Sequence, residues 1–285
     1  MLSHMPDRRW LILIVLFLAR TALAIQFQAV ASAGPFLIVA LAIDYAALGF
    51  LIGLHSLPGV AIAIPGGVLG QRLGAKRVAL IGLSLMVAGG TVMGFAQSFL
   101  LAAVGRTVLG VGAVLFNVLA TKMVTDWFSG REIATAMGTL VSSWPLGIAL
   151  GLLLFGSLGA DHGWAAIMHA STLCVLAGLV LVALFYQEPP GITSSTQAKL
   201  KLDLSRREWA LVCIAGAIWA LFNVSYIVLV SFGPELFRQR GFSLVQSNLL
   251  VSLIGWTLIP SIPLASAVAE RFGLLVLQCW DRSQP

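Results

Sequence analysis

Long apolar runs separated by short polar connections make up most of this chain of 285 residues. A membrane-spanning helix needs about 20 predominantly apolar residues to cross a hydrocarbon layer about 30 Å thick. Eight runs are long enough, at Trp10–Ala40, Tyr45–Leu69, Val78–Phe95, Phe99–Trp127, Ile133–Leu158, Trp164–Tyr186, Glu208–Val230 and Ser243–Val268. The pattern therefore predicts an all-α polytopic membrane protein. Because Gly34-Pro35 interrupts the first run, we expect its helix to kink or end there.

One longer polar connection divides the spans into two groups. Residues 187–207 contain Pro189-Pro190-Gly191, a Ser/Thr run and several charges, which are typical of a solvated linker between two bundles. The sequence thus predicts a six-helix bundle at 1–186, a cytoplasmic linker at 187–207 and two helices of a second bundle at 208–273. Residues 274–285 are too polar for a ninth span, and we expect them to form an atypical tail.

Composition favours the same class. Hydrophobic residues make up 59% of the sequence and charged residues only 10%, with a mean hydropathy of +0.98. Soluble domains carry about 25% charged residues, so we expect the lipid bilayer to surround this chain. The net charge of +6 does not indicate nucleic-acid binding, because the cations lie in short loops between apolar spans.

These cations predict the orientation, since cytoplasmic loops of membrane proteins are enriched in Lys and Arg. With the N-terminus inside, the outer loops contain only Arg238 and Arg240, whereas Arg20 and Arg106 lie within spans. The cytoplasmic segments contain the other cations, namely Arg8, Arg9, Arg72, Lys76, Arg77, Lys122, Arg131, Lys199, Lys201, Arg206, Arg207, Arg271 and Arg282. We therefore expect a multi-pass inner-membrane protein with a cytoplasmic N-terminus. Arg20 also argues against a cleaved signal peptide, because it interrupts the cleavage region.

Glycine and basic residues cluster between the second and third runs. The cluster consists of Gly67, Gln71, Arg72, Gly74, Lys76 and Arg77. Its spacing recurs near the end of the chain, at Glu270, Arg271 and Gly273, with an acid where the first copy has glutamine. The cluster resembles the gating loop between helices two and three of the major facilitator superfamily. A repeated half is also how transporters of this kind are built.

Further matches to this superfamily follow in register. Arg106 and the glycines after it resemble a segment of its fourth helix. Pro145 and Gly147 retain the Pro-x-Gly core of its exporter-associated motif and predict a kink in helix five, but the upstream glycines of that motif are missing. Ser143–Gly147 and Gln26–Gln28 are also similar to the cyanate/nitroimidazole permease branch of the superfamily.

The resemblance implies the superfamily fold, with a complete N-terminal six-helix bundle and the first two helices of a C-terminal bundle. A full member has twelve helices, so we expect the chain to be truncated at its C-terminus. The implied function is secondary active transport by alternating access, without a cofactor. Two alternatives stay open, a truncated non-transporting remnant or subunit and a drug or metabolite exporter. We expect neither an enzyme nor a metal site, because the sequence shows no paired acids, metal-ligand cluster or Ser/His pair near a membrane face.

Arg20 is the most informative single residue. It follows Trp10 by ten residues, which places it about 15 Å deep at 1.5 Å per residue. A guanidinium that faces lipid at this depth is costly, so we expect Arg20 to face a cavity or a partner. Helical spacing places Gln28 on the same face. We interpret Arg20 as a cation that binds an anionic substrate through its planar fork. The alternative is that it hydrogen-bonds neighbouring carbonyls and holds the bundle together.

Other polar residues within spans are candidates for the same site. Arg106 and Asn117 share one face of their helix, and the resemblance associates the matching arginine with gating and proton coupling. In the superfamily, helices one, four and seven line the central cavity, which adds Asn223 and Tyr226 to the substrate-binding candidates. For Arg106 the alternative is a structural hydrogen bond, and for the other two it is ordinary packing between helices.

His55 is the candidate for proton coupling. No Asp or Glu lies near the centre of a span, and an intramembrane proton carrier is normally an acid or a histidine. His55 precedes Pro58-Gly59, where a break could open the backbone towards a cavity, although a lone intramembrane histidine is more often an interhelical donor. With two cations and no acid inside spans, a small anionic solute is favoured over a cation or a neutral sugar. The sequence identifies neither the solute nor the direction of transport nor the coupling ion.

Overall fold

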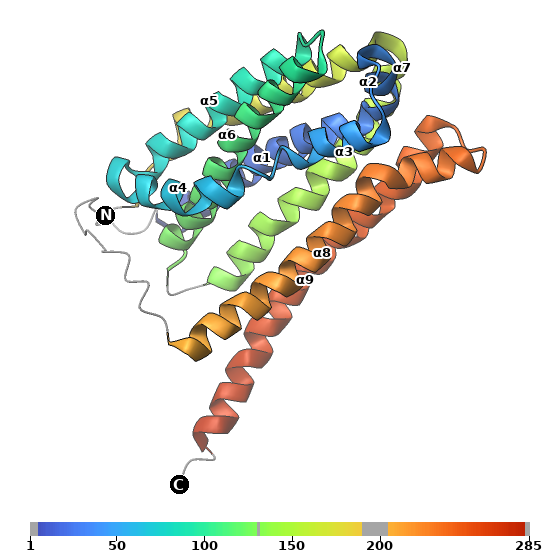
Figure 1. Cartoon of the computed structure of the whole chain (residues 1–285). Helices are drawn as coiled ribbons and strands as arrows, with labels where there is room; N and C mark the ends of the chain where they lie inside the picture. Colours follow the sequence, from blue (N-terminus) through green and yellow to red (C-terminus); the bar gives the residue numbers. More distant parts are fainter. Residues whose placement is uncertain (1–4, 130–131, 190–204, 283–285) are drawn as a thin grey trace.

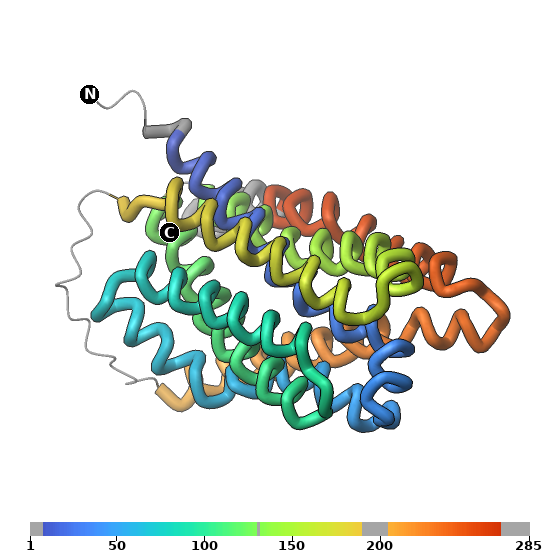
Figure 2. Tube along the Cα trace, turned by 90° about the horizontal axis from the view of Figure 1, so that it is seen from above, coloured from blue at the N-terminus to red at the C-terminus, as the bar shows by residue number. Residues whose placement is uncertain are grey.

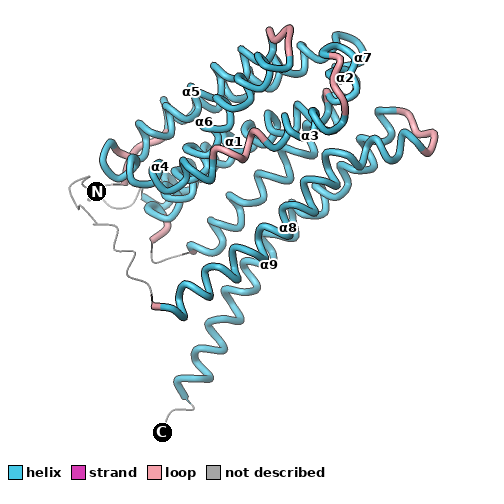
Figure 3. The backbone as a smooth tube through the Cα atoms, in the orientation of Figure 1, coloured by secondary structure: helices cyan, strands magenta, loops and turns pink. Residues whose placement is uncertain are grey.

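The computed structural model describes residues 5–129, 132–189 and 205–282. Within these residues the chain is helical apart from short connections, and it forms no strand (Figure 3). In chain order the helices are α1 (Met5–Ser32), α2 (Gly34–Leu41), α3 (Tyr45–Gly53), α4 (Gly59–Leu73), α5 (Ala75–Gly94), α6 (Phe99–Trp127), α7 (Ile133–Phe185), α8 (Arg206–Gln239) and α9 (Leu244–Arg282). Six of them are long and apolar enough to cross a membrane. The prediction of an all-α polytopic membrane protein is confirmed.

The first predicted span is interrupted where its sequence indicates. Helix α1 ends at Ser32, and α2 starts at Gly34 with Pro35 in its first turn. Proline is accepted there because the first N–H groups of a helix have no intrahelical partner. Helix α3 then leaves α2 at an angle of 116°, and the Asp44 side chain caps it by accepting from the amide of Ala47 at 2.8 Å.

The second predicted span, Tyr45–Leu69, is not one helix. Helix α3 ends at Gly53, and residues 54–58 form turns before α4 begins. Pro58 accounts for the break, because proline disfavours a helical conformation in the residue before it. The turn residues, His55 among them, are held by local backbone bonds, such as that from the His55 amide to the Ile52 carbonyl at 3.3 Å, rather than by a continuous helical ladder.

The fifth and sixth predicted spans form the two halves of α7. The chain reverses at Gly163, whose φ of 78° and ψ of 176° lie outside the helical region and suit a residue without a Cβ. Figure 2 shows the two halves running in opposite directions from this turn. Helix α8 extends beyond the predicted end at Val230. Helix α9 continues to Arg282, so residues 274–282 prolong that helix instead of starting a separate tail.

Helices α5 and α6 pack closely through reciprocal glycine contacts. A Cβ added to Gly82 would lie 2.7 Å from the carbonyl oxygen of Gly112, and one added to Gly112 would lie 2.3 Å from that of Gly82. Gly89 and Gly105 repeat the arrangement further along, at 2.5 Å and 2.8 Å. Small residues at such positions let helix backbones approach within a membrane, so these glycines set the distance between the two helices.

Helices α8 and α9 lie along one side of the other seven (Figure 1). Helix α9 packs on α7, where Gly255 meets the carbonyl of Pro145. Helix α8 is buried only in its second half, which includes Tyr226 and Val230, whereas residues 206–222 are exposed. The α5–α6 connection, the turn in α7 and the α8–α9 connection gather at the end opposite the N-terminus. Helix α8 therefore contacts the bundle through its second half, whereas α9 also meets α7 near the start of that helix, where Gly138 lies against Ser266.

Candidate functional site

A cavity of about 360 Å³ lies where α8 and α9 face the other helices. Five of its lining residues are polar, and among those five only Arg20 is charged. The polar lining residues are Arg20, Ser56, Asn117, Asn223 and Tyr226. The apolar lining residues are Val141, Trp144, Pro145, Trp219, Phe222, Ile227, Leu258 and Ile262. The cavity thus combines one cation, amide and hydroxyl groups, and an apolar wall that includes three aromatic residues.

Arg20 projects from α1 and is held by α6 and α7. Its Nε donates to Asn117 Oδ1 at 2.9 Å, and one Nη donates to the Leu140 carbonyl at 2.8 Å and to Ser143 Oγ at 3.3 Å. A guanidinium has five N–H groups, so two remain on its other terminal nitrogen. Among the described residues, the ion pairs are Arg9–Glu132, Lys122–Asp126 and Arg238–Glu235, and none includes Arg20. The guanidinium is therefore fixed in place and keeps two donors and its charge for a ligand.

The geometry of Arg20 is compatible with both interpretations from the sequence, a cation that binds an anion and a residue that holds helices together. The bonds to Leu140 and Ser143 hold helices together, as the structural alternative requires. The same bonds orient the unused edge of the fork, and Arg20 lines the cavity. A side chain preorganised in this way loses little rotamer entropy when it binds a planar anion.

Helix α8 supplies Asn223 and Tyr226 to the cavity wall. The Asn223 amide donates to the Trp219 carbonyl one turn earlier at 2.8 Å. The Tyr226 ring is 8% exposed, and its hydroxyl has no hydrogen-bond partner among the described residues. A buried hydroxyl without a partner is costly, so this group is available to a ligand.

Arg106 lies away from the cavity and is fully buried. Its three nitrogens donate to the carbonyls of Leu51 at 3.2 Å, Gln26 at 3.3 Å and Phe27 at 3.1 Å. The guanidinium also lies 5.6 Å from the centre of the Phe27 ring. It therefore ties α6 to α1 and to the broken end of α3. This contact pattern matches the structural alternative stated for it.

Gln28 and His55 are also packed between helices. Gln28 is 0% exposed and donates to Ser32 Oγ and to the Val230 carbonyl, both at 3.4 Å. His55 is 4% exposed, and its ring meets Phe27 edge-on at 4.9 Å. Its Nδ1 has no partner among the described residues. Of the predicted substrate-binding residues, the structure thus gathers Arg20, Asn117, Asn223 and Tyr226 and leaves Gln28 and Arg106 outside the cavity.

The predicted kink residues and the motif loop lie around this site. Pro145 lines the cavity, and Gly147 allows α7 to meet α1 at the Thr21 carbonyl. In the motif loop, Gly74 turns the chain with a φ of 92°. Lys76 donates to the Ala183 carbonyl at 2.9 Å, where a cation near the C-terminus of a helix is favourable. The loop also contains Gly67, on α4, and three exposed side chains, Gln71, Arg72 and Arg77.

The second copy of the motif, at Glu270, Arg271 and Gly273, lies outside the residues whose side chains the structure describes.

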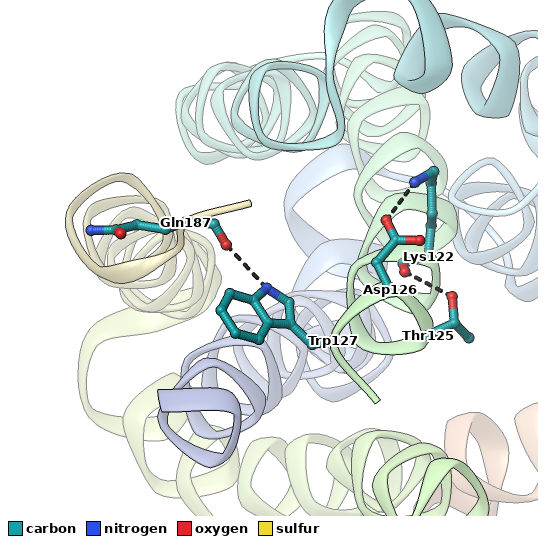
Figure 4. A network of polar contacts seen from close by, with 5 residues as sticks. All are labelled: Lys122, Thr125, Asp126, Trp127 and Gln187. Atoms are coloured by element: carbon teal, nitrogen blue, oxygen red, sulfur yellow. Dashed lines mark hydrogen bonds and ion pairs between the residues drawn. The ribbon is translucent and has the colours of Figure 1, made fainter. Parts of the chain in front are cut away.

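A polar network fastens the end of α7 to α6 (Figure 4). Trp127 Nε1 donates to the Gln187 carbonyl at 3.0 Å, and Thr125 donates to the Lys122 carbonyl at 2.7 Å. Lys122 also pairs with Asp126 one turn later. The Trp127 bond crosses from α6 to the residues that follow α7, so the chain is held in place at the first residue of the linker.

Tyr186 is buried and directly precedes Gln187 of this network. Burial raises the pKa of the Tyr186 hydroxyl, and the nearby carboxylates of Asp126 and Glu188 raise it further. Its hydroxyl has no hydrogen-bond partner among the described residues. Arg8 of α1 donates to the Gln187 side chain, so α1 is also bonded to the residues that follow α7.

Sequence reasoning missed several residues of the cavity wall. Ser56 was hidden in a run treated as one continuous helix, and it reaches the cavity because α3 breaks before it. Phe222 and Trp144 were not singled out, because an aromatic residue in an apolar span is usually packing. Trp219, Phe222 and Tyr226 recur at intervals of three and four residues, which is the signal that could have identified a common face.

The family follows from a comparison of the whole sequence. A family model described as Major Facilitator Superfamily matches residues 12–279. The chain belongs to the Major Facilitator Superfamily. Its polytopic helical fold is therefore the fold of this superfamily.

Curated relatives are distant and longer. The hexuronate transporter of Bacillus subtilis (strain 168) is 24% identical over 260 residues, covering 87% of this chain and 61% of the relative. The cis,cis-muconate transport protein of Acinetobacter baylyi (strain ATCC 33305 / BD413 / ADP1) is 29% identical over 155 residues, covering 53% of this chain and 37% of the relative. The chain thus spans less than two thirds of the length of either.

Solved structures agree in fold. A bacterial homologue of the human lysosomal transporter Spinster, in an inward-facing and unoccupied conformation, has a TM-score of 0.71 at 19% identity, covering 87% of this chain and 60% of that one. A D-xylose-proton symporter has a TM-score of 0.65 at 17% identity, covering 96% and 70%.

Proposed function

We propose that the protein is a secondary active transporter that moves a small organic anion across the inner membrane by alternating access. The observation that carries this proposal is Arg20, a cation in the wall of the cavity with two unused N–H donors and no ion-pair partner among the described residues. A carboxylate accepts two parallel bonds from such a fork. We take the N-terminus to be cytoplasmic because of the distribution of Lys and Arg.

The names of two relatives also support an anionic solute. Hexuronate and muconate, the solutes in the names of the two transporters above, are both carboxylates. The residues similar to the cyanate/nitroimidazole branch are less informative about the solute. The Nε2 groups of Gln26 and Gln28 bond to helix backbones and to Thr172 and Ser32, and neither residue lines the cavity.

The open end of the cavity fits one state of an alternating-access cycle. Residues 206–222 of α8 are exposed, whereas Gln28 of α1 bonds to Val230 of α8 nearer the far end. With the N-terminus inside, this arrangement corresponds to a state open to the cytoplasm. Protons remain a proposed coupling ion, with His55 as the candidate carrier because it is buried beside Ser56 of the cavity wall.

The proposal is tested by flux into proteoliposomes. The purified chain is reconstituted, and uptake of radiolabelled D-galacturonate, a hexuronate, and of cis,cis-muconate is measured against concentration. We expect saturable uptake of at least one of them, abolished by Arg20→Gln and unchanged by Arg240→Gln, a control that removes an exposed cation outside the cavity. Saturable uptake that Arg20→Gln leaves intact would rule out the binding role of Arg20. Absence of uptake of both anions would refute the transport proposal for this chain.

A further inference from the structure

We propose that the cavity is built for a planar, unsaturated carboxylate, which stacks on an aromatic ladder of α8 while Arg20 holds its carboxylate. The ladder consists of Trp219, Phe222 and Tyr226. This inference rests on the proposed anion site and adds the chemical class of the solute.

The three rings form a continuous surface. The centroids of Trp219 and Phe222 are 6.0 Å apart with planes at 31°, and those of Phe222 and Tyr226 are 6.1 Å apart with planes at 4°. All three residues line the cavity. The nearly parallel rings of Phe222 and Tyr226, with Trp219 tilted beside them, offer aromatic faces on which a conjugated molecule can stack.

Two rings of the ladder, Trp219 and Phe222, are not covered by protein, whereas Tyr226 is buried. Phe222 is 52% exposed and Trp219 is 61% exposed. Other faces of α8 carry aliphatic residues such as Ile218, Leu221 and Val224, which are exposed without lining the cavity. Three aromatic residues of α8 line the cavity, whereas its Trp209, which is 45% exposed, does not. The three rings on the cavity side form the surface that we assign to a ligand.

The polar groups are placed for a molecule with an anionic end and an apolar body. Arg20 and Asn117, which bond to each other, come from α1 and α6. The α8–α9 side of the cavity is mainly apolar, with Leu258 and Ile262 beside the ladder. Asn223 uses one amide hydrogen on the Trp219 carbonyl, which leaves one N–H and its Oδ1 for a ligand. The unpartnered hydroxyl of Tyr226 leaves room for one further polar contact.

The experiment compares two acids that differ in little but their π system. Benzoate and cyclohexanecarboxylate share their charge and carbon count, but only benzoate is planar and conjugated. Binding to the purified chain in lipid nanodiscs is measured by isothermal titration calorimetry. We expect benzoate to bind about fivefold more tightly, which is the order of effect that one aromatic stacking contact provides.

Variants assign that preference to the ladder. Phe222→Leu and, independently, Trp219→Leu should each bring the affinity ratio towards one, while cyclohexanecarboxylate affinity changes by less than about twofold. Phe222→Tyr keeps the ring and should keep the ratio. Phe185→Leu is the matched control, because Phe185 is an exposed aromatic residue outside the cavity.

The outcomes separate this inference from the proposed function. Equal binding of the two acids, lost in Arg20→Gln, would overturn the stacking inference and leave the anion site standing. Binding of D-galacturonate without binding of benzoate would overturn it in favour of a sugar acid. If none of the three acids binds, both the inference and the proposed anion site fail.

Discussion

Replacing Arg106 with lysine should destabilise the fold and leave the cavity intact. The side chain is fully buried and does not line the cavity. Its Nε and two terminal nitrogens each donate to a different carbonyl, on Leu51, Gln26 and Phe27. Lysine keeps the charge, but its single nitrogen cannot occupy three positions, so at least two of these bonds are lost.

The carbonyl of Leu51 depends on Arg106 most strongly. Helix α3 ends at Gly53, and the next amides, of Leu54 and His55, donate to other carbonyls. The carbonyls of Gln26 and Phe27 lie inside α1, where they also accept helical bonds. Loss of the guanidinium thus leaves one carbonyl at the break without its donor.

The expected magnitude follows from these bonds. A hydrogen bond to a charged group contributes about 1.5–3 kcal/mol, so the loss of two predicts about 3–6 kcal/mol. A buried lysine can release its proton and avoid part of this cost. We therefore expect the free energy of unfolding to fall by about 3 kcal/mol, the lower end of that range.

The assay is reversible unfolding by SDS titration in mixed micelles, followed by tryptophan fluorescence. Thr107→Val is the matched control, because the Thr107 hydroxyl bonds only to the Ala103 carbonyl of its own helix, and we expect a change below about 1 kcal/mol. An Arg106→Lys protein as stable as the parent would refute the claim that Arg106 stabilises the contact of α6 with α1 and α3. So would a variant of unchanged stability that no longer binds the anion, since Arg106 would then act on the ligand.

Three further predictions concern packing and burial. Gly112→Ala should prevent the close approach of α5 and α6 and yield aggregated protein in size-exclusion chromatography, because the new Cβ meets the Gly82 carbonyl at 2.3 Å; Gly53→Ala, with nothing within 4 Å, should remain monodisperse. Asn248→Leu should raise the free energy of unfolding by about 1 kcal/mol, since the Asn248 amide nitrogen is buried without a partner among the described residues; a decrease in the same SDS titration would mean that water satisfies it. For Tyr186, whose pKa is raised in the folded chain by burial and by Asp126 and Glu188, the associated stability is present below the unfolded pKa of about 10 and is lost as the pH rises through the folded pKa. Tyr186→Phe should therefore weaken the loss of stability above about pH 10, and identical alkaline unfolding curves for parent and variant would contradict this.

The sequence predicted where the helices lie better than it predicted their breaks and ends. Apolar length predicted the six described helices that are long and apolar enough to cross a membrane, because lipid imposes that length on any helix that crosses it. It also indicated the interruption at Gly34-Pro35. It did not show that Tyr45–Leu69 is two helices, because turn residues inside an apolar run give no hydropathy signal. The ends of α8 and α9 were missed for a related reason, since proline and glycine are tolerated within membrane helices.

Arg20 and Arg106 show how far the candidate site could be predicted from the sequence. In the sequence, Arg20 and Arg106 are alike, each a single cation in an apolar span. What separates them is which neighbouring backbone lies within reach. All three nitrogens of Arg106 donate to carbonyls of α1 and α3, whereas one terminal nitrogen of Arg20 stays free. Gln28 shares a helical face with Arg20, but α1 brings it against α8 rather than into the cavity. Such differences arise from helix packing, which the periodicity of one helix cannot report.

The same two arginines meet their partners at different times during synthesis. Every carbonyl that binds Arg106 lies earlier in the chain, so its partners have already been translated when α6 leaves the ribosome. Arg20 is the reverse case, because Asn117, Leu140 and Ser143 follow it by 97, 120 and 123 residues. Until they arrive, its guanidinium has no protein partner of this kind and is costly to leave in lipid. We therefore expect α1 to stay beside the insertion channel until α6 and the start of α7 have been made. Site-specific crosslinking of stalled nascent chains of increasing length would detect this delay, and Arg20→Leu should abolish it.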